Sequence, residues 1–90
     1  MSEIQEIQET ILEFSKDTFG VRGEVTKLSK LEDGWESELE IIRDDQYKKR
    51  HGLPQMIERY SVVLSEEKEV ISYQKEETRP RGDVEWSRDE

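Results

Sequence analysis

The sequence has no cysteine, only two prolines and few aromatic residues, and these shortages limit what the protein can be. The absence of cysteine excludes disulfides and thiolate zinc sites. The longest apolar runs span two or three residues, so the sequence shows neither a signal-peptide core nor a transmembrane helix. We therefore expect a soluble, cytoplasmic protein without a membrane partner.

The composition indicates one small, charged domain. A chain of 90 residues buries only about 60–65% of the surface that it exposes when unfolded. Hydrophobic residues make up 31% of the chain and charged residues 41%, so we expect function on the surface rather than in a deep pocket. The formal net charge of −9 opposes binding to nucleic acid and to anionic membranes.

The hydrophobic periodicity predicts one helix followed by four strands. Ser2 and Gln5 have the spacing of a helix capping box, and after Gly23 the apolar period changes from three or four residues to two. The predicted fold class is α+β, with an N-terminal amphipathic helix packed on a four-stranded antiparallel meander sheet. The predicted boundaries are about 2–19 for the helix, about 24–31, 35–42, 58–65 and 70–78 for the strands, 1–78 for the single domain, and 79–90 for a charged, flexible tail.

The first hairpin has a recognisable loop sequence. Glu32-Asp33-Gly34 fits a three-residue loop with glycine in the left-handed conformation, which would place Leu31 opposite Trp35 and Lys30 opposite Glu36. The glutamates that alternate with the apolar residues of the second strand are expected on the solvent side of the sheet.

The apolar residues on the inward positions form the expected core. The helix contributes a stripe that could pack on its own sheet or on a partner. The expected core residues are Ile7, Ile11, Phe14, Trp35, Leu39, Ile41, Tyr60, Val62, Leu64, Ile71 and Tyr73.

The segment between Arg43 and Glu58 shows no regular period, and Gly52 and Pro54 would interrupt any element there. We therefore predict a long connection, and connections of this length are often functional. It combines cations with apolar residues that no strand pattern explains, as a protein-docking element does. The candidate partner-binding residues are Tyr47, Lys48, Lys49, Arg50, Leu53, Met56 and Ile57.

Other functions have weaker support in the sequence. His51 is the only histidine, and there is no phosphate-binding glycine loop or nucleophile motif, so we expect no enzyme activity, catalytic residue, cofactor, metal or small-molecule substrate. One alternative is a nucleic-acid-associated regulator that uses the basic residues 47–51, where Tyr47 and His51 would stack on bases. Another is a small-molecule pocket between helix and sheet.

The order of several short motifs resembles the gas vesicle protein O family, which includes the related R-type gas vesicle proteins. The resemblance covers roughly residues 20 to 83 and consists of a Gly-Trp that opens a strand ending in Glu-Ile-Ile, an Arg/Pro-containing loop, a Tyr-x-Val-x-Leu strand and a basic Arg-x-Arg-Gly end. Family members commonly have an aromatic residue after the first arginine of that end, where this chain has Pro80. The residues that carry the resemblance are Gly34, Trp35, Glu40 to Ile42, Arg50, Leu53, Pro54, Tyr60, Val62, Leu64, Tyr73, Arg79, Arg81 and Gly82.

The resemblance implies a non-enzymatic accessory protein for gas vesicle formation. Its partners would be other gas vesicle proteins, either accessory proteins or the shell protein, and it would be cytoplasmic or gas vesicle-associated. The acidic composition fits a soluble adaptor or chaperone-like factor, because a large net charge keeps an aggregation-prone partner in solution.

Overall fold

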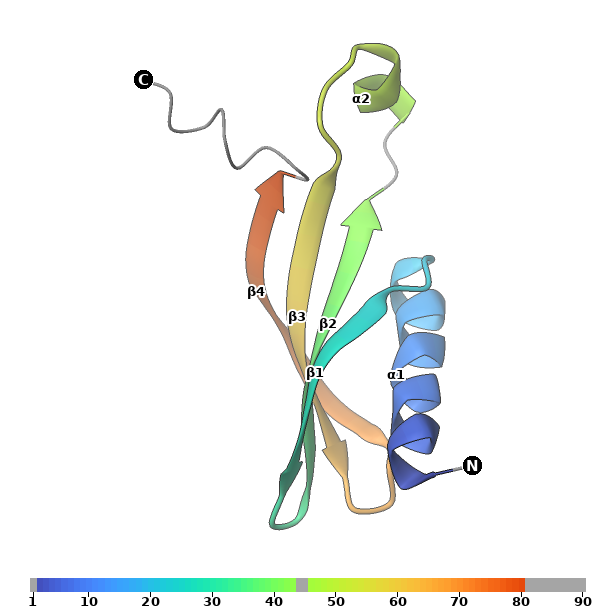
Figure 1. The fold of residues 1–90 in the computed structure, drawn as a ribbon, viewed down its shortest axis with the longest axis vertical. Helices are drawn as coiled ribbons and strands as arrows, with labels where there is room; N and C mark the ends of the chain where they lie inside the picture. The colour runs from blue at the N-terminus through green and yellow to red at the C-terminus, as the bar shows by residue number, and fades with distance from the viewer. Residues whose placement is uncertain (1, 44–45, 81–90) are drawn as a thin grey trace.

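The computed structural model describes residues 2–43 and 46–80, which form an N-terminal helix packed on a four-stranded antiparallel sheet with strand order β1-β2-β3-β4, and a short second helix (Figure 1). The predicted α+β meander is therefore confirmed, and the predicted strand ends lie within two residues of the observed ones. The elements are α1 (Glu3–Phe19), β1 (Glu24–Leu31), β2 (Gly34–Arg43), α2 (Gln46–Arg50), β3 (Met56–Ser65) and β4 (Val70–Pro80).

Helix α1 begins and ends as its sequence dictates. The Ser2 hydroxyl accepts a hydrogen bond from the Gln5 backbone N–H, and the Gln5 side chain accepts one from the Ser2 N–H, which completes the predicted capping box. At the other end, the Gly20 N–H donates to the Lys16 carbonyl. Both ends of α1 are thus satisfied by local contacts.

The core lies between α1 and the sheet and includes eight of the expected residues. Ile7 and Ile11 of α1 are fully buried against the sheet, so the apolar stripe of α1 packs on its own chain. The buried apolar residues are Ile7, Ile11, Trp35, Leu39, Ile41, Tyr60, Val62 and Leu64. Phe14 is half-buried at the border of this core, while Ile71 and Tyr73 are exposed, so the prediction that they belong to the buried core is wrong.

A buried hydroxyl joins α1 to β1. The Ser15 side chain has no exposed surface, donates a hydrogen bond to the Val21 carbonyl (2.7 Å) and accepts one from the Gly23 N–H (3.1 Å). Two backbone groups of the connection are thereby satisfied inside the protein. Ser15 therefore fixes the angle at which the chain leaves α1 and enters the sheet.

The predicted register of the first hairpin is wrong by one residue. Leu31 pairs with Gly34 and Lys30 pairs with Trp35, so the loop has two residues, Glu32 and Asp33, and Gly34 belongs to β2. Gly34 lies so close to β3 that a Cβ at this position would overlap the Leu64 carbonyl oxygen. Glycine at this position is required by the neighbouring strand rather than by the turn.

Bulges explain why the exposed residues of β4 do not follow a strict alternation. The pairing with β3 skips Ile71 and Glu76, and the pairing of β1 with β2 skips Thr26. Each extra residue changes which side of the strand faces α1. Val70 and Tyr73 consequently lie on the α1 side, opposite Leu64 and Val62 of β3.

Figure 1 shows that α1 covers only part of one sheet face. The two hairpin turns lie at the end where α1 begins, and β2, β3 and β4 extend past the other end of α1 toward α2. We call the sheet face away from α1 the open face. The prediction of a flexible tail is wrong for Arg79 and Pro80, which pair with Ile57 and Met56 within β4. The rest of the predicted tail, residues 81–90, lies outside the described residues.

Candidate protein-binding surface

The segment predicted to lack regular structure contains the short helix α2, so that prediction is wrong for Gln46–Arg50. The helix closes with a Schellman pattern, in which the Leu53 N–H bonds the Lys48 carbonyl (2.8 Å) and the Gly52 N–H bonds the Lys49 carbonyl (3.3 Å). Gly52 supplies the left-handed backbone, with φ of 67°. The basic residues are therefore presented on a defined turn.

Most of the predicted binding residues gather at this end of the molecule. Tyr47 is 64% exposed and Leu53 is 47% exposed, and both are large apolar side chains on the surface. Lys49 and Arg50 are exposed and Lys48 is half-buried. The structure thus combines cations and exposed apolar groups on α2 and the residues just after it.

An apolar pair on the open face lies at the same end. Ile42 of β2 pairs directly with Ile57 of β3, and Ile42 is 42% exposed. Together with Val21 they line a hollow of about 510 Å³, whose other lining residues are Arg22, Gly23, Glu24 and Glu40. The sequence interpretation missed Ile42, although its position next to the inward residue Ile41 on a strand already predicted an outward side chain. We call α2 with Leu53, Ile42 and Ile57 the distal surface.

Met56 does not belong to the distal surface, and its assignment to an irregular loop is wrong. It is the first residue of β3, pairs with Arg43 and Pro80, and is half-buried. Alternation along β3 places Met56 on the α1 side of the sheet and Ile57 on the open face. The structure therefore brings Ile57 to the candidate surface and separates Met56 from it.

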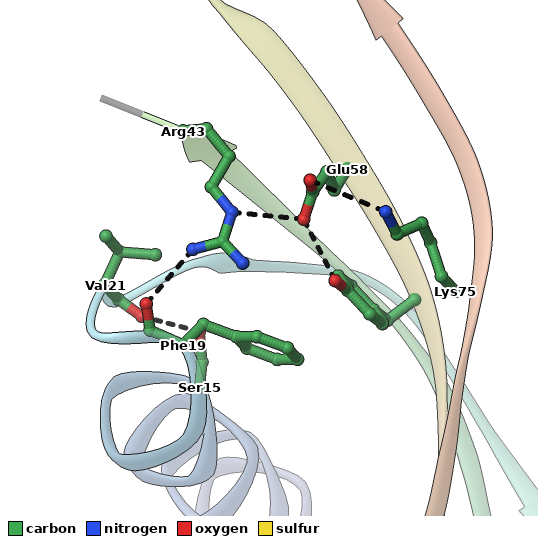
Figure 2. Close-up of polar contacts among 7 residues, drawn as sticks. Ser15, Phe19, Val21, Arg43, Glu58 and Lys75 are labelled. Carbon is green, nitrogen blue, oxygen red and sulfur yellow. Dashed lines mark hydrogen bonds and ion pairs between the residues drawn. The ribbon is translucent and has the colours of Figure 1, made fainter. Parts of the chain in front are cut away.

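A polar cluster ties the distal part of the sheet to the end of α1 (Figure 2). The Arg43 guanidinium donates to the Phe19 carbonyl (3.2 Å) and to the Glu58 carboxylate (3.2 Å), and it lies over the Phe19 ring. Glu58 also accepts a hydrogen bond from the Tyr60 hydroxyl (2.9 Å) and is 3.7 Å from the Lys75 ammonium. Arg43 thus satisfies a carbonyl at the C-terminal end of α1, where a cation is favoured.

The cluster shifts the ionisation of its two acidic groups. Burial raises the pKa of Glu58, but the hydrogen bond from Tyr60 and the charges of Arg43 and Lys75 outweigh burial, so the pKa lies below its ordinary value. Burial, together with the neighbouring Glu58 carboxylate, raises the pKa of Tyr60. Glu58 therefore carries its negative charge in the folded protein and holds three side chains together.

Glu58→Gln is expected to remove a pH-dependent part of the stability. Because the folded-state pKa of Glu58 is lowered, its contribution is present above the ordinary glutamate pKa of about 4.3 and is lost as the pH falls through the lowered value. The free energy of unfolding, measured with urea at several pH values, should favour the wild type at pH 7 and should converge for the two proteins in acid. A difference that stays constant from pH 7 to pH 3 would contradict this role.

His51 lies directly after α2, beside Tyr47. The His51 ring packs against the Tyr47 ring at a centroid distance of 4.3 Å, one helical turn away. Within residues 2–43 and 46–80, no group of three histidine, aspartate or glutamate side chains is placed to hold a metal ion. In the same ranges, no helix is both long and apolar enough to cross a membrane.

The open face carries a charged hollow nearer the hairpin turns. Its volume is about 220 Å³, and Arg59 beside it pairs with Glu77 at 2.8 Å. Cations and carboxylates from neighbouring strands alternate there, which is typical of cross-strand ion pairs on a solvated sheet face. The lining residues are Lys27, Ser29, Glu36, Ser37, Glu38, Arg59, Ser61 and Glu76. The distal surface is the stronger candidate because it adds exposed apolar groups.

Comparison of the chain with protein-family models, with curated proteins and with solved structures found no match.

Proposed function

We propose that this chain is a non-enzymatic adaptor that binds other proteins through its distal surface. The observation that carries the proposal is the combination of exposed apolar side chains, Tyr47, Leu53 and Ile42, with the cations of α2 at one end of the molecule. Apolar groups supply buried area on binding, while neighbouring cations steer an acidic partner into register. The expected partner surface is therefore acidic with an apolar centre.

More specifically, we propose an accessory role in gas vesicle formation, on the basis of the sequence resemblance. Several residues that carry the resemblance are core residues in this fold, including Trp35, Tyr60, Val62 and Leu64, and Gly34 makes the close approach to β3. These residues therefore have structural roles in the fold. Arg50 and Leu53 are also among the residues that carry the resemblance, and both lie on the distal surface. These two residues relate the resemblance to the proposed binding surface.

The test compares two double variants with the same change in charge and in apolar content. Arg50→Glu with Leu53→Ser alters the distal surface, whereas Lys16→Glu with Leu31→Ser alters exposed residues on α1 and next to the first turn. We expect the first variant to capture gas vesicle accessory or shell proteins at least about tenfold less well than wild type, which corresponds to about 1.4 kcal/mol. Capture is measured from cells that express the tagged chain with the remaining gas vesicle proteins, and far-UV circular dichroism checks the fold of each variant.

The control variant is expected to capture the same proteins as wild type. Equal loss in both variants would mean that charge alone, and not the distal surface, governs capture. Nuclease-sensitive nucleic acid in place of protein, bound with a steep salt dependence, would contradict the adaptor proposal and support a regulator that contacts phosphates.

A further inference from the structure

A second apolar surface lies between α1 and β4. Phe14 of α1 and the start of β4 line a shallow hollow of about 410 Å³, in which Ile71 is 63% exposed and Tyr73 is 48% exposed. The Tyr73 ring contacts the Phe14 ring edge-on at a centroid distance of 5.1 Å, which holds one side of the hollow in place. We call Phe14, Val70, Ile71 and Tyr73 the α1–β4 groove.

The groove has an acidic border. Asp17 lies three residues after Phe14 on α1, and Glu13 and Glu6 lie four and eleven residues before Asp17, so helical spacing places the three carboxylates on one stripe beside Phe14. All three side chains are exposed, and Glu6 forms an ion pair with Lys68 at 2.8 Å. The groove therefore fits an apolar segment that carries positive charge.

The chain itself displays such a segment on its distal surface. Tyr47 and Leu53 are exposed apolar groups, and Lys49 and Arg50 are exposed cations beside them. In Figure 1 the α2 end lies beyond the end of α1, while β4 begins beside the opposite half of α1. The distal surface and the α1–β4 groove therefore lie at different parts of the molecule.

We propose that copies of this chain associate head to tail, with the α2 end of one copy in the α1–β4 groove of the next. Because the contact joins two different surfaces, each copy can bind two others, which produces a ring or a row of copies. This inference rests on the proposed function because it uses the same distal surface. It adds a second binding surface, the α1–β4 groove with its acidic border, which binds the distal surface of another copy.

Pairing between sheet edges is a less suitable mode of association. The β4 edge is interrupted by bulges at Ile71 and Glu76, and the β1 edge by a bulge at Thr26. Bulges twist an edge and break the row of backbone groups that another strand would need. Contact through side chains in the groove avoids this obstacle.

The test uses two variants that each lose one of the two surfaces. Ile71→Lys places a cation in the groove and leaves the distal surface intact. Lys49→Glu with Arg50→Glu reverses the distal charge and leaves the groove intact. Sedimentation velocity over a concentration series should show wild-type species that grow beyond a dimer, and each variant alone should stay monomeric.

The decisive sample is an equimolar mixture of the two variants. The intact distal surface of the first fits the intact groove of the second, and the remaining surfaces are both altered, so a one-to-one dimer and nothing larger is expected. A wild type that stays monomeric, a variant that still assembles alone, or a mixture that stays monomeric would overturn the inference. Ile71→Ser replaces Ile71→Lys if the lysine variant does not fold.

Failure of this inference can be separated from failure of the adaptor proposal. Ile71→Lys leaves the distal surface unchanged, so it should capture gas vesicle proteins as wild type does. Absent self-association with normal capture would reject only the head-to-tail contact. Normal capture by Arg50→Glu with Leu53→Ser, together with self-association of the wild type, would reject only the adaptor proposal.

Discussion

Gly34→Ala is expected to destabilise the protein by about 3 kcal/mol or more. A Cβ at this position would overlap the Leu64 carbonyl oxygen, which belongs to the backbone of the neighbouring strand and cannot rotate away. Either β2 must move from β3 or the first hairpin must change register. Because a domain of this size is stable by only about 5–13 kcal/mol, a large part of its stability would be lost.

The measurement is the urea midpoint of unfolding at constant slope, compared with Gly52→Ala. Gly52 has a left-handed backbone, but no atom lies within 4 Å of a Cβ built there, so only conformational strain of about 1–2 kcal/mol is expected. If Gly34→Ala costs no more than Gly52→Ala, the close packing of β2 on β3 at this point is not as described.

Ile11→Ala is expected to destabilise the protein by about 2–5 kcal/mol. Ile11 is fully buried in the core cluster, where it joins α1 to the sheet. Removing three of its side-chain carbons leaves a cavity between two layers that cannot fully collapse. The loss of stability would show that α1 packs on its own sheet in solution.

The matched control is Ile4→Ala on the same helix. Ile4 is 53% exposed, and alanine is a better helix former than isoleucine, so a change within about 0.5 kcal/mol is expected. Thermal unfolding followed by circular dichroism should give a markedly lower midpoint for Ile11→Ala only. Equal midpoints for the two variants would contradict the packing of α1 on the sheet.

The elements with strong local signals could be predicted from the sequence. The capping box of Ser2 and Gln5 fixes the start of α1, and the period of two along β2 and β3 correctly identifies their inward residues. These features depend on neighbours within a few residues, which is the information that a single sequence carries. The strand order follows because each strand pairs with the next one along the chain.

The errors arise where distant contacts decide. The loop residues Glu32-Asp33-Gly34 match a three-residue turn, but Gly34 pairs with Leu31 and with Ser65 as part of β2, where it lies close to the Leu64 carbonyl oxygen. The bulge at Ile71 likewise depends on the pairing with β3, and it moves Ile71 out of the core. Local alternation contains no information about either contact.

The candidate site could be predicted only in part. The exposed residues of α2 and Leu53 could be predicted because they fit no strand period. The cations followed by Gly52 are a signal for the end of a helix, but the five residues of α2 are too few to show a helical period. Ile42 was missed because its role depends on pairing with Ile57 across β2 and β3. The assembled surface is therefore a product of the sheet and not of the loop alone.

Site-specific photo-crosslinking shows whether the distal surface binds another protein. A photoreactive amino acid is introduced at position 53 on the distal surface, or at position 31 near the first hairpin turn, where leucine is also partly exposed. In cells that express the gas vesicle proteins, we predict discrete crosslinked protein partners from position 53, identified by mass spectrometry, and none from position 31. No protein product from position 53, or the same products from both positions, would contradict this prediction.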